Sequence, residues 1–209
     1  MKYEEVDSVE KLRKLYDSPM DLAVKKQKVN LDQYSSQFLA LSAFSILATY
    51  GASGQVDCSP RGDYPGFIQA LDDKTIALPD RPGNNRLDSL TNIIERQNVG
   101  ILALIPGFKE CLRINGKAKI VTDADILERF EHRGKLPQTA IIVSIEEVYF
   151  HCSKAITRSK LWSTESQVDR SIMPSLGKIL MNQIDPEKSS EEIKAVEDLI
   201  ELRAKTTLY

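Results

Sequence analysis

The sequence predicts an α+β protein, a closed or half-closed antiparallel β-barrel with helical additions. Six or seven short apolar runs, separated by turn residues, predict strands. Few helical segments lie between these runs, whereas a doubly wound parallel sheet needs a crossover helix between successive strands. Helical patterns gather on either side. We therefore expect a helical extension that packs on the barrel at 1–41, the barrel at 42–162 and a C-terminal helical extension at 163–209.

The first extension is predicted to hold three helices. In 6–16, apolar residues recur at helical spacing, with Asp7 and Ser8 as cap candidates. Ser18-Pro19 interrupts the pattern, and a proline is tolerated in the first turn of the helix that we expect at 21–28. A third helix is expected at 31–41.

The strands follow this helical region. The runs 42–50, 55–59, 66–71 and 75–79 are separated by short turns, and four strands in such close succession predict an antiparallel meander. Later strands are expected at 99–105, 111–122 and 139–150. The run 111–122 alternates apolar side chains with Arg113, Asn115, Lys117 and Lys119, which predicts one buried and one polar face.

Further helices are predicted between and after the later strands. One is expected at 85–97, capped by Asn84 or Asn85 and with Asp88 in its first turn. Another is expected at 123–132, where His132 lies among charged residues and is expected to be exposed. The remaining helices are expected at 153–162, 173–184 and 191–205.

Composition limits the classes of partner. The 209 residues are 42% hydrophobic and 28% charged, as in an ordinary globular protein. A net charge of -2 gives no electrostatic reason to expect a nucleic acid or an anionic membrane as partner, so any anion site must be local.

Cysteine use and the first residues predict a cytoplasmic protein. Cys58, Cys111 and Cys152 are odd in number and far apart, which argues against a disulfide framework or a zinc site. The start of the chain is acidic where a signal peptide is basic, and the apolar runs are too short to cross a bilayer.

The segment Pro82-Gly83-Asn84-Asn85-Arg86 is the first candidate site. A strand ends, a turn follows, and a helix begins whose first N–H groups have no partner within the helix. With Arg86, these donors can hold a phosphate. The alternative is an ordinary Asn-capped helix beside a solvated arginine.

A second candidate is Ser59-Pro60-Arg61-Gly62-Asp63, at the end of a predicted strand. Arg61 can be a further phosphate ligand, and the alternative is a turn with an internal Arg61–Asp63 pair. Arg113 is either solvated or reaches a ligand held by another subunit.

No sequence pattern predicts an acid–base, nucleophilic or metal site. His151 and Cys152 are adjacent, but a metal site needs three or four ligands and no carboxylate lies at ligand spacing. Trp162, the sole tryptophan, is more typical of a core than of a cofactor platform.

Taken together, four segments resemble the pyridoxamine 5'-phosphate oxidase-like family of FMN-binding split-barrel proteins, and within it a bacterial branch described as FMN-dependent enzymes. The resemblance covers about 39–162, with the segments in the family's order. They are Ser59-Pro60-Arg61-Gly62-Asp63, Pro79-Asp80-Arg81-Pro82-Gly83-Asn84-Asn85-Arg86-Leu87, Leu112-Arg113-Ile114-Asn115-Gly116-Lys117-Ala118 and His151-Cys152-Ser153-Lys154-Ala155.

The resemblance implies a six-stranded split barrel and a homodimer with FMN in two clefts between subunits. It implies that Arg86 holds the phosphate together with Asn84 and Asn85, and that the backbone of 57–60 runs along the isoalloxazine. The cofactor-binding residues that it implies are Asp57, Ser59, Pro60, Arg61, Pro79, Asp80, Asn84, Asn85, Arg86 and Leu87. Candidates for closing the cleft, from either subunit, are Arg113, Lys154, Arg158 and Trp162.

Two departures bear on activity. The oxidases have an arginine where this chain has Val56, and residues 204–209 do not match their substrate-binding C-terminal end. We therefore expect FMN binding but not vitamin B6 oxidation. The leading hypothesis is an FMN-dependent oxidoreductase that acts on NAD(P)H or another small molecule, because the flavin itself performs the redox chemistry. The alternatives are a flavin-binding module without turnover, or a split barrel that uses haem or F420.

Overall fold

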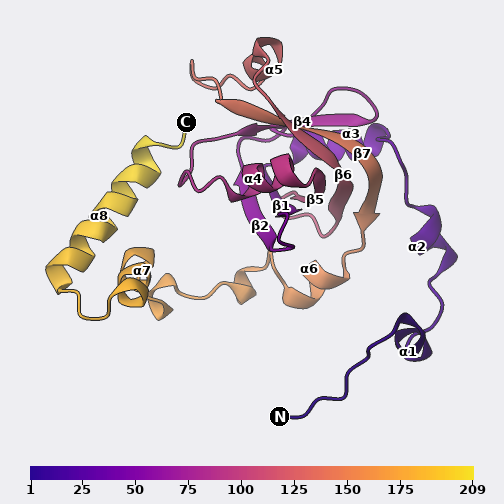
Figure 1. The fold of residues 1–209 in the computed structure, drawn as a ribbon, viewed down its shortest axis with the longest axis horizontal. Helices are drawn as coiled ribbons and strands as arrows, with labels where there is room; N and C mark the ends of the chain where they lie inside the picture. Colours follow the sequence, from indigo (N-terminus) through magenta and orange to yellow (C-terminus); the bar gives the residue numbers. More distant parts are fainter.

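The computed structural model describes residues 1–209 and contains one seven-stranded antiparallel sheet (Figure 1). Neighbouring strands follow the order β2-β1-β5-β6-β7-β4-β3. The strands are β1 (Phe44–Tyr50), β2 (Val56–Gly62), β3 (Gln69–Ala70), β4 (Thr75–Asp80), β5 (Asn98–Leu104), β6 (Cys111–Val121) and β7 (Thr139–His151).

The sheet curls until its two ends meet. β2 and β4 are far apart in the strand order, yet Arg61 of β2 forms an ion pair with Asp80 of β4 at 2.7 Å. Beside it, Asp63 pairs with Arg81 at 2.6 Å. Side chains rather than a backbone ladder therefore join the two ends, and the predicted half-closed antiparallel barrel is confirmed. The sheet has seven strands rather than six, because the two-residue β3 is added at one end.

The predicted meander is wrong. β1 and β2 form one hairpin and β3 and β4 another, but the two hairpins lie at opposite ends of the strand order. The predicted strand at 66–71 shrinks to Gln69–Ala70 because Phe67 and Ile68 are successive residues that are both buried in the core. Alternation, which a strand with one buried face requires, is therefore broken at this point.

Alternating burial positions the other strands. Along β1, buried residues alternate with more exposed ones, and β6 turns Ile114 and Ala118 inward while Lys117 and Lys119 face solvent. The main core cluster of 20 buried residues draws on these strands and on two helices that pack against the sheet. This confirms the predicted two-faced character of residues 111–122.

Three helices precede the sheet, and their burial differs. α3 (Gln33–Leu41) begins with a capping box formed by Asp32 and Ser35, and it buries Phe38 and Leu39. By contrast, α1 (Val9–Lys14) and α2 (Asp21–Lys25) bury no residue. α2 ends before the predicted residue 28 because the backbone of Lys28 forms two hydrogen bonds with Val148 of β7, at 3.0 and 2.8 Å.

The later helices lie between and beyond the strands. They are α4 (Asp88–Glu95), α5 (Ala124–Glu128), α6 (Lys154–Ser159), α7 (Leu176–Ile184) and α8 (Ser190–Thr206), with short 3-10 turns at Thr164–Ser166 and Arg170–Ile172. α7 and α8 pack against each other and extend away from the sheet, and the chain after α8 returns toward it (Figure 1). None of these helices combines the length and the apolar character that crossing a bilayer requires.

Candidate functional site

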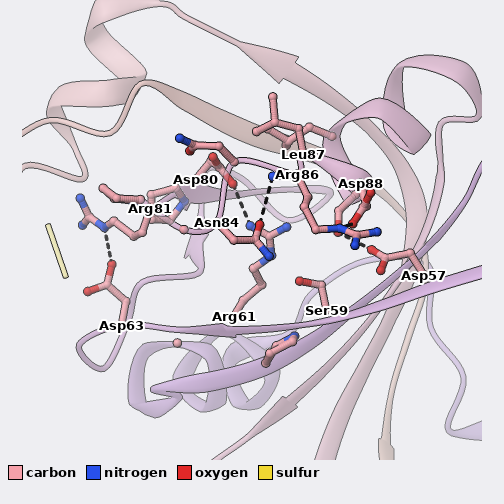
Figure 2. A pocket seen from close by; sticks show the side chains of 18 of the residues that line it. Asp57, Ser59, Arg61, Asp63, Asp80, Arg81, Asn84, Arg86, Leu87 and Asp88 are labelled. Carbon is pink, nitrogen blue, oxygen red and sulfur yellow. Dashed lines mark hydrogen bonds and ion pairs between the residues drawn. The ribbon is translucent and has the colours of Figure 1, made fainter. Parts of the chain in front are cut away.

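A cleft lies where the two ends of the curled sheet meet. It encloses about 500 Å³ and is lined by residues 57–63, 79–90 and Phe67. β2 forms one wall, and the end of β4, the following loop and the start of α4 form the other. Figure 2 shows Arg81 and Asp63 at one end of this cleft and Asp57, Arg86 and Asp88 at the other.

Most of the predicted cofactor residues line this single cleft. Those that do are Asp57, Ser59, Pro60, Arg61, Pro79, Asp80, Asn84, Asn85, Arg86 and Leu87. The cleft also contains Arg81, Asp88, Ser89 and Leu90, which the resemblance did not single out. Each of these four is next to a predicted residue or within a few positions of one, so closeness in the sequence could have indicated that they line the same cleft.

The four residues proposed to close the cleft lie outside it. Arg113 stacks over the Tyr149 ring, with 5.6 Å between its Cζ atom and the ring centroid. Lys154 and Arg158 are exposed on α6. Trp162 is 38% exposed rather than part of the core, and its indole N–H donates to the carbonyl of Phe108 at 2.6 Å.

The helix that faces the cleft begins later than predicted. α4 starts at Asp88, and neither Asn84 nor Asn85 is its cap. Asn85 and Leu87 have left-handed φ values of 59° and 60°, and the Asn84 side chain accepts a hydrogen bond from the Arg86 N–H at 3.0 Å. Such local bonds from asparagine favour turns over helix.

The later start still directs the helix N-terminus at the cleft. Asp88, Ser89 and Leu90 form the first turn of α4, and all three line the cleft. N–H groups in a first turn have no intrahelical acceptor, and the helix dipole adds a partial positive charge there. The predicted arrangement of helix start and arginine is therefore present, but the Asn84–Leu87 loop separates the strand from the helix.

Each of three arginines in the cleft pairs with an aspartate. Arg61 contacts Asp80 at 2.7 Å and Arg81 contacts Asp63 at 2.6 Å. The alternative of an internal Arg61–Asp63 pair is wrong, because both side chains reach across the split between the sheet's ends. The third pair, Arg86–Asp88 at 2.8 Å, joins the loop to the start of α4.

The three arginines differ in how firmly they are held. The side chains of Arg61 and Arg81 are 18% and 12% exposed, whereas that of Arg86 is 72% exposed. The hydrogen bond to Asp88 and the charges of Asp88 and Asp57 raise the pKa of Arg86, so it remains a cation. Exposed ion pairs are weak, and Arg86 can therefore exchange Asp88 for an anionic ligand.

A hydrogen-bond network orders the end of the cleft next to α4. The Ser89 hydroxyl donates to the Asp57 carboxylate at 2.5 Å. Asn92 of α4 donates to the Thr49 hydroxyl of β1 at 3.0 Å, and that hydroxyl lies 3.5 Å from Asp57. The network joins β1, β2 and α4, so the cleft wall at Asp57 is fixed before any ligand arrives.

β2 presents unpaired backbone to the cleft. It is the end strand of the sheet and pairs only with β1, so its other edge has no ladder partner. Pro60 lies within β2, a position that proline tolerates on edge strands. The free N–H and C=O groups of this edge can bind the polar rim of a planar ligand.

His151 belongs to a different part of the molecule. It ends β7, near Lys26, Arg113 and Tyr149, and none of these residues lines the cleft. Burial, together with the charges of Lys26 and Arg113, lowers the pKa of His151. No group of three or more histidine, cysteine or acidic side chains is arranged to hold a metal ion.

Comparison with known proteins agrees with the resemblance seen in the motifs. The sequence model of one family, described as Pyridoxamine 5'-phosphate oxidase, matches residues 31–152. No curated protein matches the chain. Similar solved structures include HupZ of Group A Streptococcus, at 19% identity over 56% of this chain and 91% of that chain, with a TM-score of 0.47.

Two further similar structures come from other bacteria. An FMN-binding protein from Syntrophomonas wolfei is 14% identical over 55% of this chain and 81% of its own, with a TM-score of 0.44. General Stress Protein 26 from Bacillus anthracis is 15% identical over 55% of this chain and 88% of its own, with a TM-score of 0.41.

Proposed function

The chain belongs to the pyridoxamine 5'-phosphate oxidase family, and we propose that it is an FMN-dependent oxidoreductase that binds its cofactor in the cleft between β2 and the start of α4. The observation that carries this proposal is the coincidence of the predicted cofactor residues in that cleft, which is of a size typical for small-molecule sites.

The donors present in the cleft fit a phosphate-bearing flavin. The Nε–H of Arg61 is buried and has no hydrogen-bond partner, although the same guanidinium holds Asp80 through Nη1. Arg86 and the first turn of α4 add an exposed cation and free N–H groups. The phosphate would replace Asp88 as the partner of Arg86, and Arg61 would provide a second contact.

The remaining cleft wall fits an aromatic ring system. The free edge of β2 from Asp57 to Pro60 would bind the polar edge of the isoalloxazine, as the resemblance implied. When bound, FMN would supply the hydride or electron transfer. The protein's own residues would bind the phosphate, orient the ring and limit access of water. Because the flavin would carry out the redox step, the chain would not need to supply an acid–base pair.

We also propose a homodimer in which each cleft is completed by the partner. Arg113, Lys154, Arg158 and Trp162 all lie outside their own cleft, and they are the proposed residues for closing the cleft of a second copy. The other partner is a small-molecule substrate or NAD(P)H, which would enter against the exposed face of the flavin.

Cofactor selectivity provides the test. We expect the purified protein to be yellow, or the apo protein to bind FMN in preference to FAD, because the adenylate of FAD would crowd the seat for a terminal phosphate. A fluorescence titration measures both affinities. An apo protein that leaves FMN fluorescence unchanged would contradict the proposal, as would a haem or F420 absorption spectrum.

Turnover is tested separately from binding. We expect NADH or NADPH to bleach the flavin absorption under anaerobic conditions, since a catalytic flavin must accept electrons from a donor. A protein that binds FMN tightly, but whose flavin no nicotinamide or other donor reduces, would instead be a flavin-binding module.

A further inference from the structure

Tyr209 lies just beyond α8, which ends at Thr206, and contacts residues of the barrel. Its hydroxyl donates to the Asp63 carboxylate at 2.8 Å, and its ring lies 4.3 Å from the His132 ring. The Arg81 guanidinium is 5.2 Å from the Tyr209 ring centroid. Tyr64 stacks on the other side of His132 at 5.1 Å, so His132 is enclosed by two tyrosines rather than exposed as predicted.

These contacts reach the cleft through one ion pair. Asp63 and Arg81 both line the cleft, and the Asp63 side chain is only 1% exposed. One Asp63 oxygen binds Arg81, and the other accepts from Tyr209 and from the Tyr64 N–H at 2.8 Å. Arg81 is further held by the Phe130 carbonyl at 2.8 Å. Tyr209 thus covers the Asp63–Arg81 pair on one side, and the other side of this pair faces the cleft.

We propose that Tyr209 is a positioning residue for the cleft, which holds the Asp63–Arg81 pair in place and so couples the α7–α8 hairpin to ligand binding. The identity of the ligand rests on the proposed function, but the ordering of the cleft wall does not. The hydrogen bond that the Tyr209 hydroxyl donates to Asp63 raises the pKa of Tyr209.

The α7–α8 hairpin contacts the barrel through the segment that ends in Tyr209. Gly177 of α7 packs against Glu197 of α8, and Ser175 hydrogen bonds to Glu197, so the two helices support each other. They extend away from the sheet in Figure 1. Where the chain returns to the barrel, the Lys135 ammonium donates to the Tyr209 carbonyl at 2.6 Å, next to the Asp63 contact.

Three variants of the full chain separate the possibilities. Tyr209→Ala removes both ring and hydroxyl, Tyr209→Phe removes the hydroxyl only, and Leu208→Ala is the matched control at an exposed neighbour. We expect Tyr209→Ala to weaken FMN binding about threefold to tenfold, with Tyr209→Phe in between and Leu208→Ala at the wild-type value. Equal affinity in all four proteins would overturn the proposal.

Docking of Tyr209 has its own readout, because the chain contains only 2 histidines. The ring current of Tyr209 acts on His132, so Tyr209→Ala should move the His132 proton resonances and leave those of His151 in place. Unmoved His132 resonances would show that Tyr209 does not dock there in solution, and the proposal would fall.

Hydrogen exchange tests the coupling without any cofactor. In the apo protein, Tyr209→Ala should speed amide exchange in 79–87, while exchange in β5 and β6 stays slow because the core is untouched. Unchanged exchange in 79–87 would overturn the proposal. If the wild-type protein does not bind FMN at all, the proposed function fails, and the exchange measurement still decides whether Tyr209 orders the cleft wall.

Discussion

Among the cleft residues, Arg86 is the cation best placed to meet an incoming anion. Arg61 and Arg81 are held across the split in the barrel by buried or half-buried aspartates, whereas Arg86 points into solvent with Asp88 as its partner. The three side chains carry the same guanidinium group, so their different exposure and their different aspartate partners determine which of them can bind a ligand. Arg61 and Arg81 close the barrel, Arg61 keeps its Nε–H free as a second donor, and Arg86 is the exposed cation that can exchange its partner.

Arg86→Ala should therefore weaken FMN binding about tenfold to a hundredfold, the usual scale for losing a charge-assisted hydrogen bond. Folding should survive because Arg86 lies in the loop before α4 and is largely exposed. Arg96→Ala is the control, since Arg96 is exposed at the opposite end of the same helix. Fluorescence titration measures both variants, and equal losses would place the phosphate elsewhere.

His151 should give the protein's stability a pH dependence in the mildly acidic range. Burial and two nearby cations lower its pKa in the folded state below the ordinary 6.5. The unfolded chain then binds the proton more readily, so the free energy of unfolding falls as pH drops below about 6.5. In urea unfolding at about pH 7 and about pH 5.5, His151→Gln should lose less stability than the wild type. Identical pH dependence in both would contradict this.

Among the elements, β6 and β7 pair around a bulge in β7, whose extra residue Glu146 lies opposite Asn115 and Gly116. The register of the two strands shifts between Asn115 and Gly116. A Cβ atom at Gly116 would collide with the backbone carbonyl of Ser144 on β7. Glycine is therefore required at position 116, because the β7 backbone approaches β6 closely there.

Gly116→Ala should lower the free energy of unfolding by about 1–3 kcal/mol, because the backbone of β7 would have to move. Gly100→Ala on β5 is the matched control, since a Cβ atom there would meet its nearest neighbours at 3.4 and 3.8 Å. Urea unfolding compares the two variants. A Gly116→Ala protein that is as stable as Gly100→Ala would show that the β6–β7 ladder absorbs the added methyl group.

Across the whole molecule, apolar surface is concentrated on the segments outside the sheet. α1 and α2 bury no residue, and large apolar side chains on them and on the α7–α8 hairpin are exposed in a single chain. Those side chains include Val9, Leu12, Leu22, Val24, Leu176, Ile184, Leu199 and Leu202. Exposed apolar residues in such number favour burial against another chain.

We therefore expect a homodimer in solution, with the helical extensions and the polar face of β6 at or near the interface. Sedimentation equilibrium at micromolar concentration should give twice the mass of the chain. A monomer mass at that concentration would contradict the proposed completion of each cleft by its partner. A dimer that persists after Arg113→Ala but binds FMN more weakly would place Arg113 in the partner's cleft.

The sequence by itself determined most elements and the family. Alternating burial and turn residues are local properties, so β1, β4, β5, β6 and β7 lie close to their predicted positions. The motifs from Ser59 to Leu87 carried the resemblance because they combine residue type with order along the chain. The family match over residues 31–152 confirms it.

Only the tertiary structure decided which segments meet. Local patterns do not specify that β2 and β4 face each other across the split, so the partners of Arg61 and Asp63 could not be assigned from the sequence. The start of α4 moved to Asp88 because left-handed residues at Asn85 and Leu87 continue the loop. The contact of Tyr209 with Asp63 joins residues 146 positions apart, and the local periodicity of helices and strands cannot predict contacts over that separation. Side-chain partners across such separations depend on how the whole chain packs, and these long-range contacts determine the shape of the cleft.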